Sequence, residues 1–428
     1  MTPTDDRDSA GFGELLRGNA NVRRLWGGTV VSLFGDWFNT LALYRLAIDL
    51  TGSEAALGGV FLTKMLPLAL ASPIAGVLVD RFDRKHILIV ADLVRAVIVL
   101  GFLFVEDAGD LWLLYTLAAL QIAVSAAFTP AKNALLPGLT SPRELLTANA
   151  LLSATWSTML ALGAAAGGPA VDAFGTDAVF LFDAATYLVS AAFIWRLRAP
   201  EARRPAVVDA AESALRVAGR QIWDGWQYLR RRPDVGRMAL AKASWGVGGG
   251  GLVLALALVG DQLFPGVGTT GIGVLFAARG VGTGLGPVVG RALFRDARRW
   301  PLVLGGCVVA SGLGYVGISQ ALDARLAVVA LVVFAHAASG ANWVFSTTLL
   351  QRRAADAFRG RVFATDWLLV TLVESASIAM ASVLLEAGVA LGALVLGLAT
   401  VQVGVGLVWI LTVVPVERRA EAARNVGP

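Results

Sequence analysis

Residues that bind metals or form covalent cross-links are scarce in this sequence of 428 residues. It contains one cysteine, Cys307, and two histidines, His86 and His336. A single cysteine excludes an intrachain disulfide, and so few thiols and imidazoles exclude a zinc site built from several such ligands. No metal or other cofactor is therefore expected.

Charged residues are also few, at 16% of the chain, whereas 56% of the residues are apolar and the mean hydropathy is +0.68. These values exclude a disordered chain, a collagen-like chain and an ordinary soluble enzyme. Because a membrane-spanning helix needs about 20 apolar residues, the apolar content is enough for about twelve spans. We therefore expect a polytopic membrane protein.

Apolar runs bounded by charges or by glycine and proline mark the predicted spans. They are nearly continuous in Leu, Val, Ala and Gly, which indicates helices rather than the alternating strands of a β-barrel. The first set lies at about 25–47, 57–79, 86–105, 111–130, 146–170 and 178–196, and the second at about 238–260, 271–294, 301–320, 326–349, 364–386 and 389–413. The expected fold is all-α, with twelve transmembrane helices in two pseudo-symmetric six-helix bundles.

A polar, arginine-rich segment separates the two sets of spans. The predicted organisation is an N-terminal arm (1–24), an N-terminal bundle (25–197), a linker (198–237), a C-terminal bundle (238–414) and a tail (415–428). Displacing the sequence by half its length aligns Gly59 and Pro73 with Gly273 and Pro287, which favours an internal repeat. Two such halves that rock about a central site are one known solution to alternating access.

The linker also carries apolar residues at helical spacing, among them Ile222, Trp226 and Leu229, with arginines around them. This pattern predicts either an amphipathic helix on the membrane surface or a solvated linker helix.

Basic residues gather on one side of the predicted spans. The connections after odd-numbered spans hold Asp and Glu with a single basic residue, Arg325, while nearly all other Lys and Arg lie on the opposite side. The positive-inside rule then places both termini in the cytoplasm. The pI near 9.7 is thereby explained without nucleic-acid binding. We expect a multi-pass protein of the bacterial inner (plasma) membrane, a monomer whose first span is an uncleaved anchor.

The connection after the second span reads Gly-Val-Leu-Val-Asp-Arg-Phe-Asp-Arg-Lys over residues 76–85. It resembles the loop signature of the major facilitator superfamily. Asp83, where many members have glycine, and the upstream Lys64-Met-Leu-Pro67 are similar to the third drug:proton antiporter subfamily, which includes macrolide-efflux and enterobactin-export proteins. Further matches are Gly35-Asp36, Ala148-Asn149, Asp183-Ala-Ala-Thr186-Tyr187 and Arg359-Gly360-Arg361-Val362.

The resemblance implies a cytoplasmic gate. In the family, Asp80 faces the start of the eleventh span, here near Arg361 to Asp366; Gly76 would let helices approach closely. The predicted gate residues are Gly76, Asp80, Arg81, Asp83, Arg84, Lys85, Asp92, Arg95 and Arg361. The alternative is a basic loop that only sets topology. Many drug antiporters carry an arginine near the start of the fourth span, whereas residues 111–130 contain no Lys or Arg.

Charges inside the predicted spans are candidates for function, because each costs about 2.5–3.5 kcal/mol to insert. The predicted proton-coupling and substrate-cavity residues are Asp36, Lys64, Asp183, Arg279 and Glu374. A proton-coupled exporter needs a carboxylate that takes up a proton in one access state and releases it in the other; desolvation and an approaching cation supply these two effects. Asp36 opposed by Lys64 is the first candidate and Glu374 the second. The alternative for each is a static ion pair.

Together these features predict a secondary active exporter of amphipathic small molecules, coupled to protons, whose partners are its substrate, protons and membrane lipids. The alternatives are a transporter of lysophospholipid or other lipid, or an uncoupled facilitator. More remote are a non-transporting membrane sensor and a membrane enzyme. No catalytic motif is visible, and the glycine-rich run 246–251 lacks the Lys-Ser/Thr of a phosphate-binding loop.

Overall fold

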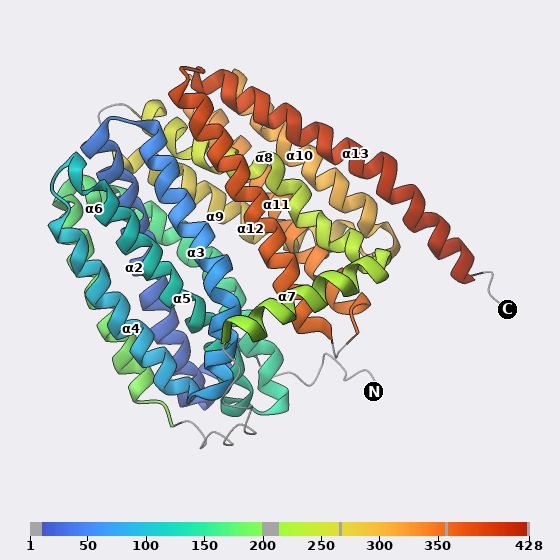
Figure 1. The fold of residues 1–428 in the computed structure, drawn as a ribbon, viewed down its shortest axis with the longest axis horizontal. Helices are drawn as coiled ribbons and strands as arrows, with labels where there is room; N and C mark the ends of the chain where they lie inside the picture. Colours follow the sequence, from blue (N-terminus) through green and yellow to red (C-terminus); the bar gives the residue numbers. More distant parts are fainter. Residues whose placement is uncertain (1–10, 199–213, 265–267, 356–357, 426–428) are drawn as a thin grey trace.

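The computed structural model describes residues 11–198, 214–264, 268–355 and 358–425, and within these ranges every regular element is a helix (Figure 1). The helices of the first half are α1 (Phe12–Gly18), α2 (Ala20–Thr51), α3 (Glu54–Arg81), α4 (Arg84–Leu100), α5 (Leu111–Leu139) and α6 (Pro142–Trp195). Those that follow are α7 (Ala214–Arg231), α8 (Pro233–Leu263), α9 (Thr269–Leu293), α10 (Trp300–Gln320), α11 (Arg325–Arg353), α12 (Arg359–Glu386) and α13 (Leu391–Asn425). Short 3-10 turns are η2 (Gly101–Phe104), η3 (Ala108–Asp110) and η4 (Ala297–Arg299).

Local sequence signals account for where several helices begin and end. The Asn19 side chain accepts hydrogen bonds from the backbone N–H groups of Asn21 and Val22 and so caps α2. The same helix ends at Gly52, whose φ of 61° is the left-handed conformation that glycine adopts without strain. Gly175, with φ 79° and ψ 169°, interrupts α6 and separates two consecutive helical segments.

The described helices agree with the predicted number of spans. Ten of them are long and apolar enough to cross a membrane. One of the ten, α6, is 54 residues long and contains the two segments on either side of Gly175. The 32-residue α2 adds a further span, although Asp36, Arg45 and other charges along it lower its hydropathy. The predicted all-α membrane fold is confirmed.

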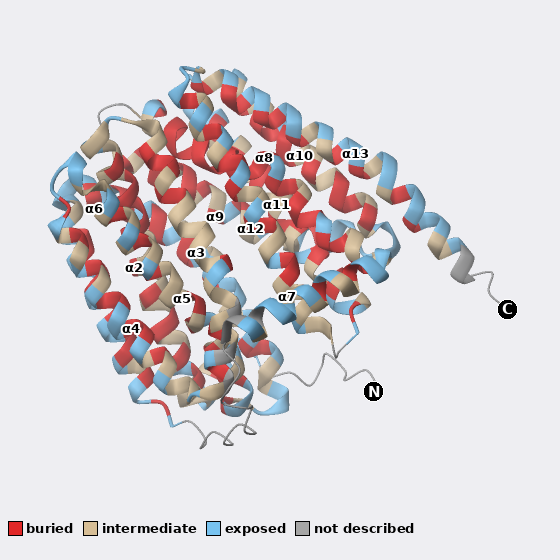
Figure 2. Cartoon of the chain, viewed as in Figure 1, coloured by how far each residue is buried: buried red, intermediate tan, exposed pale blue. Residues whose placement is uncertain are grey.

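Helices α2–α6 form one half of the molecule and α8–α13 the other, with α7 lying across one end (Figure 1). Buried residues occupy the interior of both halves (Figure 2). Large apolar side chains such as Phe174, Leu326 and Leu411 are exposed on the outside, as expected for a surface that contacts lipid. We call the end that carries α1, α7 and most arginines the basic end, and the opposite end the acidic end.

Glycines bring the backbones of α6 and α9 into direct contact between the two halves. A Cβ atom on Gly168 would lie 2.6 Å from the carbonyl oxygen of Thr269. One on Gly273 would lie 2.5 Å from the carbonyl oxygen of Ala164, and one on Gly280 would lie 2.6 Å from the nitrogen of Ala161. Small residues at a helix interface permit this close approach within a membrane.

A carboxylate fastens the two halves together at the acidic end. Asp172, at the end of the first segment of α6, accepts hydrogen bonds from the backbone nitrogens of Thr269 and Thr270, each at 2.8 Å, and from Thr270 Oγ1 at 2.6 Å. It therefore caps the N-terminus of α9, a helix that has no side-chain cap of its own. Arg45 Nη1 of α2, at 4.0 Å from Asp261 Oδ1 of α8, adds a second link.

These hydrogen bonds also determine how the cap responds to pH. Partial burial by itself raises the pKa of Asp172, but the hydrogen bonds from Thr270 and Thr269 outweigh this effect, so the pKa lies below its ordinary value of 3.8. A carboxylate with a depressed pKa stabilises the arrangement above its ordinary pKa and loses that contribution as the pH falls through the lowered value.

At the basic end, α7 packs against α12 and also contacts α3. The Tyr228 ring stacks on Phe358 at 4.7 Å between centroids, and its hydroxyl accepts a hydrogen bond from the Ala355 nitrogen at 3.0 Å. Asp224 of α7 pairs with Arg361 of α12 at 3.4 Å. The predicted linker helix is therefore packed mainly against the second half.

We predict that Asp172→Ala loosens the acidic end by about 1 kcal/mol, the usual value of a helix cap. Spin labels at Asp107 and Asp323, exposed at the acidic end of the two halves, would report the change by pulsed electron resonance in a Cys307→Ser background. Longer distances should become more populated. In the unsubstituted protein the distances should stay constant from pH 8 to pH 5 and lengthen only below about pH 4.

Asp177→Ala is the matched control, because Asp177 lies on the same helix and is exposed. Identical distance distributions for Asp172→Ala and Asp177→Ala would contradict the capping role.

Candidate functional site

Asp36 of α2 belongs to a chain of polar side chains inside the first half. Tyr187 of α6 donates a hydrogen bond to Asp36 Oδ1 and accepts one from Gln121 Nε2 at 3.0 Å. Lys64 Nζ of α3 donates to Thr40 Oγ1 at 2.6 Å, and Thr40 in turn donates to the backbone carbonyl of Asp36 at 2.6 Å. Asp36 and Lys64 are half-buried and are thus linked through Thr40 rather than by a direct ion pair.

Asp183 lies deeper in the same half and is fully buried. Its Oδ2 accepts a hydrogen bond from Asn39 Nδ2 at 2.8 Å, and its Oδ1 accepts one from Thr186 Oγ1 at 3.3 Å. Gly35 leaves the room for this arrangement, since a Cβ there would overlap both Asp183 and Thr186. Lys64 lies within electrostatic range of both Asp36 and Asp183, so the structure brings these three predicted residues close together.

Asp92 and Arg95 of α4 join this network from the basic-end side. The two side chains form a buried ion pair. The guanidinium carbon of Arg95 lies 4.3 Å from the centre of the Tyr187 ring and 4.6 Å from that of Phe128. A guanidinium held between two aromatic faces is stabilised by cation–π attraction. These contacts place the pair beside Tyr187 in the core, and none of them is to residues 76–85.

Arg279 of α9 lies where the second half meets the first. Its guanidinium is half-buried, 5.5 Å above the centre of the Phe276 ring. Phe276 packs on Trp37 and Tyr44 of α2, with ring centroids 6.4 and 5.8 Å apart. An aromatic layer therefore connects Arg279 to the helix that carries Asp36.

Glu374 of α12 is half-buried and lies within electrostatic range of Arg279. Glycines of α8 make space for it, because a Cβ on Gly246 would lie 3.0 Å from Glu374 Cγ. His336 is fully enclosed and shares a 2.9 Å hydrogen bond with the hydroxyl of Tyr315. Each half thus contributes one partly exposed carboxylate and one partly exposed cation to the middle of the molecule.

Lys242 of α8 and Asp366 of α12 form a site that the sequence did not reveal. Lys242 Nζ lies 2.6 Å from Asp366 Oδ2, and the two side chains are 3% and 1% exposed. The ammonium also lies 5.3 Å from the centre of the Trp343 ring. Both residues fall a few positions inside predicted spans (238–260 and 364–386), which was the available signal.

The predicted gate residues between positions 76 and 85 lie at the basic end, and three of them are bound within their own half. Asp83 caps α4 by accepting a hydrogen bond from the His86 nitrogen at 2.9 Å. Arg84 Nη1 donates to the Ala134 carbonyl at 2.9 Å, and Lys85 Nζ donates to the Leu197 carbonyl at 2.8 Å. In residues 76–85 only Phe82 and Asp83 lie between α3 and α4, and this connection is thereby held by α5 and by Leu197, just after α6.

The predicted gate also includes Gly76, Asp80, Arg81 and Arg361. The close helix approach expected at Gly76 is absent in this arrangement, since a Cβ there would meet no atom of the described residues within 4 Å. Arg81 is half-buried, and the side chain of Asp80 lies outside the described part of the chain. Arg361 pairs with Asp224 of α7. The gating role of these residues stays a prediction.

Comparison with known proteins identifies the family. Residues 25–372 match the sequence profile of the Major Facilitator Superfamily. The chain belongs to this superfamily. Its members are transporters, so the protein is a transporter and not an enzyme, as the sequence predicted.

Relatives within the superfamily include export proteins. The uncharacterized MFS-type transporter YfiS of Bacillus subtilis is 28% identical, over 91% of this chain and 93% of its own. The putative bacilysin exporter BacE of the same species is 30% identical over 42% of this chain and 44% of its own. Macrolide efflux protein A of Streptococcus pyogenes is 36% identical over 29% of this chain and 31% of its own. The matches to the two export proteins span less than half of their length.

Solved transporters of the superfamily share the fold. A peptide transporter POT in complex with alafosfalin superposes with a TM-score of 0.75 and 12% identity, over 96% of this chain and 97% of its own. The nucleoside transporter NupG superposes with a TM-score of 0.69 and 11% identity, over 92% and 99%. At these identities the likeness establishes the fold alone.

We predict that Asp366→Asn lowers the stability of the protein by about 3–5 kcal/mol, because it leaves the Lys242 ammonium buried without a counter-charge. The double variant Lys242→Met/Asp366→Leu should recover most of the loss, since apolar side chains need no partner. Thermal unfolding of the purified protein in detergent measures both. A single variant as stable as the parent would show that the pair is not the counter-charge system described here.

Proposed function

We propose that the protein is a secondary active exporter, which moves amphipathic small molecules out of the cell by alternating access in exchange for protons. Two contacts of Asp36 support this proposal: its carboxylate accepts a hydrogen bond from Tyr187, and its backbone carbonyl accepts one from Thr40, to which the Lys64 ammonium donates. The half-buried ammonium is thus within electrostatic range of the half-buried carboxylate without a direct ion pair. Such a carboxylate has two alternative neutralising partners, a proton and the nearby ammonium.

The orientation follows from the charge distribution. The arginine-rich basic end is assigned to the cytoplasm and the acidic end to the outside, in agreement with the positive-inside rule. The Asp172 cap and the glycine contacts between α6 and α9 then close the outer end. We therefore assign the described arrangement to the state that receives substrate from the cytoplasm or the inner leaflet.

Asp36 is assigned the role of proton carrier. While it is ionised, Tyr187 donates a hydrogen bond to it and stabilises the charge. Protonation removes that charge. The attraction of the Tyr187 hydroxyl and of the Lys64 ammonium to the Asp36 carboxylate then weakens. Release of the proton in the other state is favoured when Lys64 leaves Thr40 and approaches the carboxylate directly. Arg95, which lies against the face of Tyr187, keeps the ring in place.

The substrate is assigned to the space between this network and the second half. Trp37 and Trp156, whose ring centroids lie 6.4 Å apart, offer apolar faces, and Arg279 and Glu374 offer polar contacts of both signs. An amphipathic molecule fits this combination, since its apolar body packs on the rings while its polar group binds a charged side chain. The bacilysin exporter and macrolide efflux protein among the relatives support export of such molecules.

The basic end is proposed to close when the outer end opens. Residues 76–85 would then approach the start of α12 near Arg361, on the opposite side of α7. At present Arg361 is engaged by Asp224 of α7. Closure therefore requires the loop and α7 to compete for the same end of α12.

The test is accumulation of macrolides, cationic dyes and siderophores in an efflux-deficient bacterium that produces the protein, with and without a protonophore. We predict that the protein lowers accumulation of at least one class, that the protonophore abolishes the effect, and that Asp36→Asn reduces efflux at least tenfold. Tyr187→Phe should give a partial loss, because a hydrogen bond to a charged group contributes about 1.5–3 kcal/mol.

Glu106→Gln is the matched control, as Glu106 is an exposed acid at the other end of the same half. Unchanged efflux by Asp36→Asn would refute its assigned role. Export that persists with the protonophore would indicate an uncoupled facilitator. No effect on any compound, with the protein present in the membrane, would favour lipid transport.

A further inference from the structure

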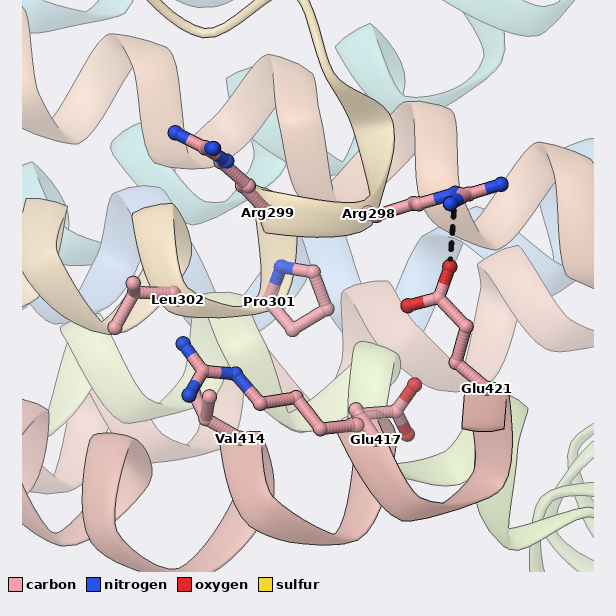
Figure 3. A pocket seen from close by; sticks show the side chains of 8 residues that line it. Arg298, Arg299, Pro301, Leu302, Val414, Glu417 and Glu421 are labelled. Carbon is pink, nitrogen blue, oxygen red and sulfur yellow. Dashed lines mark ion pairs between the residues drawn. The ribbon is translucent and has the colours of Figure 1, made fainter. Parts of the chain in front are cut away.

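A pocket of about 220 Å³ opens on the surface of the second half at the basic end, remote from the central network. It lies between the start of α10 and the end of α13 (Figure 3). Arg298 and Arg299 of η4 extend in opposite directions (Figure 3). Arg418 of α13 completes the basic lining.

The carboxylates of the pocket are already neutralised. Glu417 is 5% exposed and is bound by Arg237 of α8 at 2.7 Å and by Arg353 of α11 at 2.8 Å. Glu421 pairs with Arg298 at 3.1 Å. Within the described ranges, Arg418 is exposed and pairs with no carboxylate. Arg299 lies 3.8 Å from Asp296 Oδ2 in an exposed pair. Arg418 therefore adds an uncompensated positive charge to the pocket, and the positive end of the α10 helix dipole, where Pro301 is near the first turn, adds to it.

The apolar surface beside the pocket places it at the level of lipid headgroups. Leu407 and Leu411 of α13 are 46% and 73% exposed, and Arg418 follows Leu411 by seven residues, about two helical turns along the same face. An apolar stripe thus ends at an arginine. The half-buried Trp300 lies beside this level and donates to the Phe294 carbonyl at 2.9 Å. Tryptophan is enriched where membrane meets water.

We propose that this pocket binds the phosphate group of an anionic phospholipid, with Arg299 and Arg418 as the principal contacts and the acyl chains along Leu407 and Leu411. Basic pockets between transmembrane helices recognise anionic headgroups in this way. The apolar stripe favours a lipid over free phosphate, because inorganic phosphate has no apolar part that could contact it. The site is independent of the proposed transport reaction.

The experiment measures lipid retention by native mass spectrometry of the full chain in detergent, with phosphatidylglycerol, phosphatidylcholine and inorganic phosphate as probes. The double variant Arg299→Gln/Arg418→Gln leaves the Arg298–Glu421 pair intact. We expect the parent to retain phosphatidylglycerol in preference to phosphatidylcholine, and the variant to bind phosphatidylglycerol at least tenfold more weakly, as each basic residue near an anionic headgroup contributes to the attraction.

The matched control is Arg198→Gln/Arg291→Gln, which removes two exposed arginines of the basic end away from the pocket. It should bind phosphatidylglycerol like the parent. An equal loss in both double variants would show general attraction to the basic end and overturn the site. Inorganic phosphate that displaces phosphatidylglycerol at millimolar concentration, or equal retention of both lipids, would likewise overturn a lipid-specific site. Thermal unfolding of each variant verifies that it is folded.

Discussion

Inside a membrane no water solvates a charge, so every ionised side chain must find its partner within the protein. Two kinds of arrangement satisfy this constraint, and the direct kind occurs in both halves, since Asp92 and Arg95 form a buried ion pair in the first. In the second half, Lys242 and Asp366 neutralise each other in direct contact and are sealed from the surroundings. In the first half, Thr40 stands between Lys64 and Asp36, and Tyr187 provides the direct contact to the carboxylate. The sealed pair favours one structure, whereas the indirect one leaves the carboxylate able to change partners.

Close packing between the halves follows from a second constraint, the absence of a hydrophobic driving force between helices in lipid. Association then depends on van der Waals contact, which is largest where backbones touch. Gly168, Gly273 and Gly280 provide this contact between α6 and α9. An interface of such small residues has few interlocking side chains. The two helices can therefore tilt against each other without first separating. The Asp172 cap supplies the directional contact that the glycines lack.

The sequence predicted the helical membrane fold and the family, because hydropathy and the loop motif are local signals. It also selected Asp36, Lys64 and Asp183, whose cost in lipid is evident from position alone. Other features depend on which helix lies opposite, and periodicity carries no such information. Arg95 was expected near the gate yet contacts Tyr187, the Lys242–Asp366 pair joins residues 124 positions apart, and Asp172 caps a helix of the other half. A Cβ on Gly76 would meet no atom of the described residues within 4 Å, which the small residue in the motif did not indicate.

Helix α7 has a mechanical consequence for any rocking motion. Its stacking of Tyr228 on Phe358 and the Asp224–Arg361 pair attach it to α12, while its contact with α3 involves neither of these. If the halves rotate, we expect α7 to move with α12 and the second half. Helix α3 would then slide along the surface of α7. At the basic end the two halves would then slide past each other in a shear motion and would not simply move apart. The direction of this sliding would follow the axis of α7. The linker helix would therefore direct the relative motion of the halves as well as join them.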